Sequence, residues 1–188
     1  MKNIMAIAVL ATGLSGCALP YFEPLEPTRV EVAGSYTVDP QIKWSRGKTQ
    51  HVEIWTVDGP LLESVRFFDA RADGDPLLVP GPDQTLPTFK KDMRASEVQE
   101  FVVDTLSASG ASRVEASNLR PWDFGVLSGF RFELSYVNQD GLEYDAFAVG
   151  AISEEKLYLI LYAGTRRYYY PKYRGFAEAI VASIQPAA

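Results

Sequence analysis

The sequence predicts an α+β fold, in which an antiparallel sheet carries two amphipathic helices packed on it. Several segments of strand length alternate apolar and polar residues with a period of two, as half-buried strands require. Two other segments, 96–110 and 171–184, place apolar residues three and four positions apart, which is typical of amphipathic helices. The chain has 188 residues, 47% of them hydrophobic, and no internal repeat, which favours one ordinary domain.

Residues 1–16 have the composition of an export signal. Lys2 precedes an apolar run over residues 4–13, and this run is shorter than the roughly 20 residues that a spanning helix needs. The run is followed by Leu14-Ser15-Gly16-Cys17, which resembles the lipobox of bacterial lipoprotein precursors. The alternative is an ordinary secretory signal in which Cys17 stands by chance.

The lipobox resemblance implies a membrane anchor. In that family the signal peptidase cuts before the cysteine, whose sulfur carries a diacylglyceryl group and whose amine is acylated, for example by palmitate. Cys17 is the only cysteine in the chain, so lipidation gives it a role that a lone exported thiol otherwise lacks. Ala18 rather than Asp follows it, which by the sorting rule of enteric bacteria favours the outer membrane, facing the periplasm.

Net charge and residue counts argue against several kinds of partner. The chain carries a formal charge of −6, which argues against nucleic acid and against a polybasic patch that would assist membrane binding. A single cysteine cannot form an intramolecular disulfide, and one cysteine with one histidine is too few for an ordinary structural zinc site. We expect no metal and no cofactor.

Residues 17–28 are predicted to form a tether between the lipid and the domain. Pro20, Pro24 and Pro27 are incompatible with a helix and unfavourable in a strand. An extended spacer of this length would hold the domain roughly 30 Å from the membrane. The globular domain then comprises residues 29–188.

Four strands are expected in the first part of the domain. Val52, Ile54 and Thr56 share one side of an alternating segment, and Asp58-Gly59 supplies turn residues for a hairpin after it. The predicted strands cover residues 29–38, 41–45, 51–57 and 61–68.

A proline-rich loop separates these strands from the first helix. Residues 71–91 contain four prolines, and an irregular segment of this length is usually either functional or disordered. Ser96 and Gln99 have the spacing of a capping box, and Gly110 stands where a left-handed helix end is expected. These signals predict the first helix between residues 96 and 110.

The second half is expected to form a three-strand meander and a closing helix. Apolar residues at positions 130, 132, 134 and 136 alternate with polar ones, whereas residues 157–163 are apolar on both faces, as a central strand requires. Turn residues at 138–141 and 153–156 separate the strands. The closing helix starts near Pro171, ends before Pro186 and carries one apolar stripe: Tyr173, Phe176, Ala177, Ile180, Val181 and Ile184.

This second half resembles a known family. Residues 129–184 combine a glycine-led strand, the strand at 157–162, a tyrosine-rich linker and a closing helix with Phe176, Ile180 and Ile184. In this order they resemble the second half of PsbP-like domains, which are α-β-α sandwiches. The resemblance implies a binding or assembly module and no particular reaction.

The sequence contains no recognisable catalytic centre. His51 is the only histidine, and a Ser-His-Asp set would have to assemble from distant segments without a strained nucleophile turn. An envelope hydrolase with such a site is therefore the alternative to a non-enzymatic binding module. Asp69, Asp73 and Asp75 lack the spacing and the terminal Glu of an EF-hand, so a solvated turn is expected there.

One cationic and aromatic cluster is the candidate contact surface of this acidic protein. Arg stacks on rings and binds carboxylates in a bidentate manner, while Tyr buries a ring and presents a hydroxyl, so such a cluster suits an envelope protein or an anionic or glycan ligand. The alternative is that alternate tyrosines complete the core. The rings of Pro121-Trp122-Asp123-Phe124 in a polar loop form a second candidate. The first cluster consists of Arg166, Arg167, Tyr168, Tyr169, Tyr170, Lys172, Tyr173 and Arg174.

Overall fold

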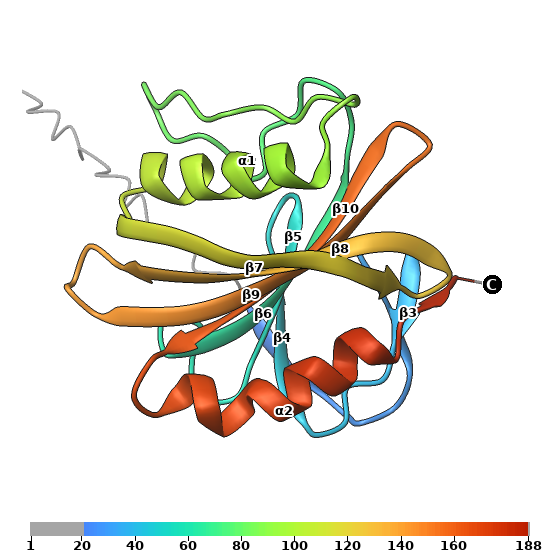
Figure 1. Ribbon diagram of the computed structural model, residues 1–188. Coiled ribbons are helices and arrows are strands. Elements are labelled where there is room, and N and C mark those ends of the chain that lie inside the picture. The colour runs from blue at the N-terminus through green and yellow to red at the C-terminus, as the bar shows by residue number, and fades with distance from the viewer. Residues whose placement is uncertain (1–20, 188) are drawn as a thin grey trace, which may run out of the picture.

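The computed structural model describes residues 21–187 (Figure 1). Cys17 and the predicted signal peptide lie outside the described residues. Within that range the chain forms eleven strands and two helices. In chain order they are β1 (Phe22–Leu25), β2 (Val30–Val32), β3 (Tyr36–Val38), β4 (Trp44–Lys48), β5 (Val52–Thr56), β6 (Glu63–Arg71), α1 (Ala95–Ala108), β7 (Ser112–Phe124), β8 (Leu127–Val137), β9 (Glu143–Ser153), β10 (Lys156–Thr165), α2 (Tyr169–Ala182) and β11 (Gln185–Pro186).

Eight of these strands form one antiparallel sheet in the order β1-β4-β5-β6-β10-β9-β8-β7, and β11, β3 and β2 form a small second sheet. Helix α1 packs against β7 and β8 on one face. Helix α2 and the small sheet cover the other face, so α1 and α2 lie on opposite sides of the large sheet (Figure 1). This arrangement confirms the predicted α+β fold with two helices on an antiparallel sheet.

Each face of the sheet has its own hydrophobic core. On the α2 side, Ile180 of α2 belongs to a cluster with Trp55 and Tyr162 of the sheet. On the α1 side, Val102 of α1 belongs to a second cluster with Leu159. Strands β9 and β10 contribute to both cores, which explains why residues 157–163 are apolar on both faces.

The predicted tether is wrong over part of its length, because it contains a strand. Residues Phe22–Leu25 pair with β4, with Phe22 opposite Gly47 and Leu25 opposite Trp44. Strand β1 is the edge of the sheet, and an edge strand tolerates Pro24 because one side of it needs no ladder hydrogen bond.

The predicted strand 29–38 is instead the hairpin of β2 and β3. Three residues, Ala33, Gly34 and Ser35, connect the paired Val32 and Tyr36, and Ala33 and Gly34 adopt the left-handed conformation with φ of 51° and 57°. Strands β4 and β6 also lie two to three residues further along the chain than predicted.

The predicted three-strand meander is a four-strand meander, because β7 precedes it. Two irregularities interrupt its pairing with β8, and Arg113 and Asn118 have positive φ at these points. Each irregularity resets the alternation of faces, so the period of two does not persist along the segment. Residues 121–124 therefore belong to a strand and not to the predicted polar loop.

Both helices differ from the prediction at their ends. The capping residues of α1 are Arg94 and Glu97 in place of Ser96 and Gln99, since the Glu97 carboxylate accepts the Arg94 backbone N–H at 2.7 Å. Gly110 adopts the expected left-handed conformation, with φ of 95°. Helix α2 begins two residues before Pro171, and Pro186 belongs to β11.

Candidate contact surface at the start of α2

The predicted contact cluster begins in the linker between β10 and α2 and continues into the first turns of α2. The linker is fixed to two neighbouring turns. The Thr165 backbone N–H donates to the Leu62 carbonyl at 2.9 Å, and the Arg166 N–H donates to the Glu143 carbonyl at 2.9 Å. These bonds join the linker to the β5–β6 turn and to the β8–β9 turn. The β8–β9 turn and the linker both lie at the left of Figure 1.

Two tyrosines of the cluster belong to the core and not to the surface, which corrects their assignment. Tyr170 and Tyr173 are buried in the cluster on the α2 side. The Tyr173 hydroxyl donates to Asp58 Oδ2 at 2.7 Å, and the Tyr162 hydroxyl donates to the Tyr170 carbonyl at 2.9 Å. Burial raises the pKa of Tyr170, so its phenol stays neutral.

Three cations of the cluster are neutralised by nearby carboxylates. Arg166 lies 2.9 Å from Asp145, and Arg174 lies 3.0 Å from Glu178. Lys172 lies 2.8 Å from Asp58, and this hydrogen bond raises the pKa of Lys172 and lowers the pKa of Asp58. Arg166 joins the linker to β9 and Lys172 joins α2 to the β5–β6 turn, whereas the pair of Arg174 and Glu178 lies within α2.

Arg166, Lys172 and Arg174 are exposed but paired with carboxylates, so Arg167 and Tyr168 are the exposed residues of the cluster that form no salt bridge within residues 21–187. Arg167 is exposed and forms no salt bridge with any residue from 21 to 187. Tyr168 is 59% exposed and packs edge-on against Tyr169, with ring centroids 4.9 Å apart. We expect a partner that contacts this corner to meet these two side chains first.

Exposed apolar side chains on the adjoining turns extend this corner. Leu61 is 70% exposed, and Val57 and Leu142 are also exposed. Single apolar residues in turns carry no periodic signal, so the sequence pattern did not identify them. We call Val57, Leu61, Leu142, Arg167 and Tyr168 together the linker surface.

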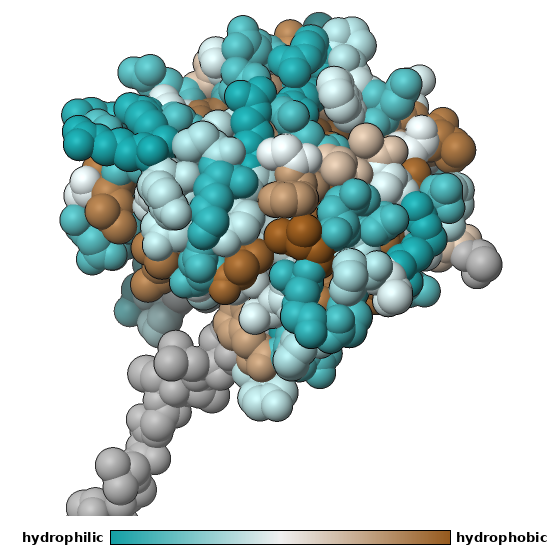
Figure 2. Space-filling model, turned by 90° about the horizontal axis from the view of Figure 1, so that it is seen from below, coloured by the Kyte–Doolittle hydropathy of each residue, from teal (hydrophilic) through white to brown (hydrophobic). Residues whose placement is uncertain are grey.

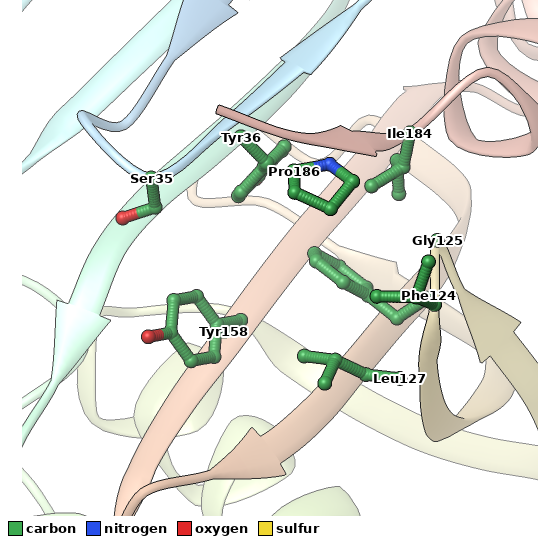
Figure 3. A pocket seen from close by; sticks show the side chains of 9 residues that line it. Ser35, Tyr36, Phe124, Gly125, Leu127, Tyr158, Ile184 and Pro186 are labelled. Carbon is green, nitrogen blue, oxygen red and sulfur yellow. The ribbon is translucent and has the colours of Figure 1, made fainter. Parts of the chain in front are cut away.

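An apolar pocket lies at the opposite end of α2, beside β11 (Figure 3). Its volume is about 160 Å³, and Tyr36, Phe124, Leu127, Tyr158, Ile184 and Pro186 line it. An apolar cavity of about 150 Å³ can hold a benzene-sized group. Val126 at the tip of the β7–β8 hairpin is 79% exposed beside it. This pocket can accept an apolar group but offers no charged side chain to orient it.

The second predicted surface is partly buried. Phe124 is a core residue, and the Arg131 guanidinium lies over the Trp122 ring, 5.1 Å from its centre.

Figure 2 shows the molecule from below, where hydrophilic residues predominate around a central group of hydrophobic ones. Phe176, predicted to lie in the buried stripe of α2, is 38% exposed.

The candidate chemical groups elsewhere are separate from this surface. His51 Nδ1 lies 3.8 Å from Asp69 Oδ2, and among residues 21–187 no serine hydroxyl bonds to its ring. The carboxylates of Asp73 and Asp75 accept the N–H groups of Lys91 and Ala72, as in a structured turn. In the same range no group of three or more His, Cys, Asp or Glu side chains is arranged to hold a metal ion.

The sequence matches no protein-family model and no curated protein. A solved structure is similar: cyanobacterial PsbP (CyanoP) from Synechocystis sp. PCC 6803, with a TM-score of 0.54 over 94% of this chain and 99% of that chain, at 13% identity. The fold is PsbP-like. The resemblance predicted from residues 129–184 is thereby confirmed for the fold and extends over most of the chain.

Neither helix of the described chain combines the length and apolarity that crossing a bilayer demands. The two candidate surfaces, the linker surface and the apolar pocket beside β11, lie at opposite ends of α2.

Proposed function

We propose that this chain is a lipid-anchored, non-enzymatic binding module of the cell envelope that contacts a protein partner through the linker surface. The observation that carries the proposal is the exposure of Arg167 and Tyr168 on a linker fixed by hydrogen bonds on both sides. A rigid contact loses little conformational entropy on binding.

The composition of the linker surface supports a protein partner. Tyr and Arg are enriched among the residues that dominate binding energy in protein interfaces. Leu61, Leu142 and Val57 supply apolar area around them. A cation without a carboxylate partner in a protein of net charge −6 favours a partner with an acidic group at the matching position.

The anchor proposed for this module is the lipid on Cys17, in the outer membrane and facing the periplasm. Two acyl chains already suffice for stable membrane attachment, and the lipobox-like sequence before Cys17 supports three. Because β1 begins at Phe22, only four residues separate it from Cys17. Four residues span at most about 14 Å, so the lipid would hold the edge of the sheet close to the bilayer.

The proposal is tested by photo-crosslinking in cells, with a photoreactive amino acid in place of Tyr168. We expect a defined protein adduct that is lost in Arg167→Glu and retained in Lys156→Glu. Lys156 is exposed at the other end of β10, so its replacement makes the same charge change away from the linker surface. An adduct that persists in Arg167→Glu would move the contact elsewhere.

The same strains test the anchor. Cys17→Ser should release the protein from the membrane fraction, because the remaining domain has no other proposed membrane contact. Retention of Cys17→Ser in membranes after a salt wash would contradict lipidation.

A further inference from the structure

A second pocket, lined by apolar side chains together with charged and polar ones, lies on the α1 side of the sheet, where α1 ends. It has a volume of about 280 Å³. Helix α1 covers β7 and β8 and stops at Ala108; beyond its end the pocket is lined by Leu78 of the loop after β6 and by residues of the β5–β6 and β8–β9 turns. Pro60, Leu61 and Leu78 form apolar walls.

Arg66 of β6 supplies the positive charge in this pocket. It lies opposite Ile54 of β5 and Leu161 of β10 and is half-buried. Its Nε donates to Ser64 Oγ at 3.3 Å, but within residues 21–187 no carboxylate lies within salt-bridge distance of its guanidinium. A cation withdrawn from water without a partner is unfavourable, so this arginine is suited to an incoming anion.

Two stacked tyrosines line the pocket beside Arg66. The rings of Tyr136 and Tyr144 are 5.1 Å apart and almost parallel, at 1°. The Tyr144 hydroxyl donates to the Leu61 carbonyl, which joins the β9 strand to the β5–β6 turn.

The Tyr136 hydroxyl is a donor without a partner. Tyr136 is only 7% exposed, yet its hydroxyl bonds to no group in the described part of the chain. Burial raises the pKa of Tyr136, and the Arg66 cation opposes that shift. The hydroxyl is therefore protonated at neutral pH and can donate to a ligand.

We propose that this pocket binds a carboxylate attached to an apolar or aromatic body. The two terminal nitrogens of Arg66 match a carboxylate in bidentate geometry, and the Tyr136 hydroxyl adds a third donor. The body of the ligand would contact Leu61, Leu78 and the stacked rings. Asp140 at the rim repels a second negative charge, so the site selects monoanions over phosphate dianions.

The carboxylate could belong to a free small acid or to an acidic side chain of a peptide. Neither Arg66 nor Tyr136 is part of the linker surface, so this pocket and the proposed partner contact are tested by different variants.

Calorimetric titration of the full-length chain in non-ionic detergent tests the proposal. One probe is 3-phenylpropionate, its neutral control is 3-phenylpropionamide, and the peptide probe is N-acetyl-Phe-Glu-amide. We expect the carboxylates to bind at least about tenfold more tightly than the amide, because charge-assisted hydrogen bonds are roughly twice as strong as neutral ones. Tighter binding of 3-phenylpropionate would indicate a free small acid as the ligand, and tighter binding of N-acetyl-Phe-Glu-amide would indicate an acidic side chain of a peptide.

Variants assign the binding to this pocket. Arg66→Gln should weaken 3-phenylpropionate binding about tenfold or more, and Tyr136→Phe should weaken it less while keeping the stacked ring. Lys156→Gln, which removes one cation at the far end of β10, should bind as the parent does. If Arg66→Gln does not fold, as judged by circular dichroism, Tyr136→Phe decides the outcome. Equal binding of acid and amide, unchanged binding in the folded variants, or no binding of either carboxylate would overturn the proposal.

Discussion

The two faces of the sheet are packed by different chemistry. The core on the α2 side contains Trp44, Trp55 and Tyr162 and encloses buried charged side chains. The core on the α1 side is built mostly from aliphatic residues and phenylalanines, including Val98, Val102, Phe132 and Leu159, with the stacked Tyr136 and Tyr144 at one end. The first core is therefore specified by directional polar contacts, whereas the second relies on apolar contact along one helix stripe.

Two buried charges illustrate the difference. Glu53 accepts the Trp55 indole N–H at 2.8 Å and pairs with Arg46 Nε at 2.6 Å. Arg131 lies 4.1 Å from the centre of the Phe147 ring and pairs with Glu178 of α2 at 2.9 Å. A buried ion pair adds little net stability, but removing one partner is costly. These pairs fix where α2 and the strands of that side can lie.

The largest expected effect comes from placing a charge in the core on the α2 side. Ile180 is 0% exposed, so Ile180→Asp buries an unpaired carboxylate at a cost of several kcal/mol, against a typical stability of about 5–15 kcal/mol. The domain should fail to fold, as measured by circular dichroism and thermal melting.

Phe176→Asp is the matched control for this change. Phe176 lies on the same helix but is exposed, so its replacement should leave a folded domain. A melting temperature within a few degrees of the parent in Ile180→Asp would mean that α2 does not pack as described.

A smaller effect is expected from single substitutions that remove one buried contact on each face of the sheet. Glu53→Ala should destabilise the domain by about 3 kcal/mol, because Arg46 and the Trp55 indole lose their partner. Val102→Ala on the α1 side should cost about 2 kcal/mol through lost apolar burial. Denaturant unfolding gives both values.

Double variants sharpen this contrast. In the Glu53→Ala background, Arg46→Ala should lower the free energy of unfolding only slightly further, which corresponds to a coupling of about 1–3 kcal/mol. The effects of Arg46→Ala and Val102→Ala on the free energy of unfolding should instead be additive to within about 0.5 kcal/mol. If the effects of Glu53→Ala and Arg46→Ala on the free energy of unfolding were fully additive, the pair on the α2 side would not be a coupled unit.

Elements with a regular sequence pattern could be predicted from the sequence, whereas strands with an interrupted pattern could not. The helix stripes, apart from the exposed Phe176, follow from apolar residues three and four positions apart, the β8–β9 and β9–β10 turns follow from turn residues, and the strand buried on both faces follows from a continuous apolar run. Strand β7 was missed because bulges at Arg113 and Asn118 interrupt its alternation, and β1 was missed because Pro24 is tolerated only at an edge.

The candidate sites were predicted less well, because they depend on tertiary contacts. Composition identified the cationic and aromatic segment, but only the fold decides that Tyr170 and Tyr173 are buried while Arg167 and Tyr168 are exposed. Arg66 lies in a segment with an ordinary strand pattern. No local signal reveals that its side chain lacks a carboxylate or that stacked tyrosines from two other strands lie beside it.

The smallest expected effect is a pH dependence from Glu63, a third buried charge. Glu63 has the same orientation along β6 as Val65 and Phe67 of the α2 side. Its Oε1 accepts the Thr56 hydroxyl at 2.7 Å and the Asp58 N–H at 3.0 Å, but Oε2 is buried without a partner among residues 21–187. Burial raises the pKa of Glu63 above its ordinary 4.5 and outweighs these hydrogen bonds.

A raised carboxyl pKa means that the folded state binds the proton more tightly than the unfolded chain. The contribution of Glu63 to stability is therefore most favourable below about pH 4.5 and declines as the pH rises through the pKa of the folded state.

Asp58 acts in the opposite direction, because its pKa is lowered by the hydrogen bond from Lys172. Its contribution is present above about pH 4 and is lost on acidification. Melting temperatures of the parent, Glu63→Gln and Asp58→Asn from about pH 3 to about pH 8 separate the two groups. Glu63→Gln should be destabilised by an amount that does not depend on pH, since its amide N–H₂ replaces the unpartnered oxygen. The difference in melting temperature between Glu63→Gln and the parent should nevertheless shift in favour of Glu63→Gln as the pH rises, because only the parent ionises a buried carboxyl. Relative to the parent, the melting temperature of Asp58→Asn should instead fall as the pH rises from about 3 to about 4, because the parent gains the Asp58 contribution over that interval. Parallel curves for the parent and Glu63→Gln would show that Glu63 does not titrate differently in the folded and unfolded states, and that the α2 side tolerates its unpartnered oxygen in the ionised form.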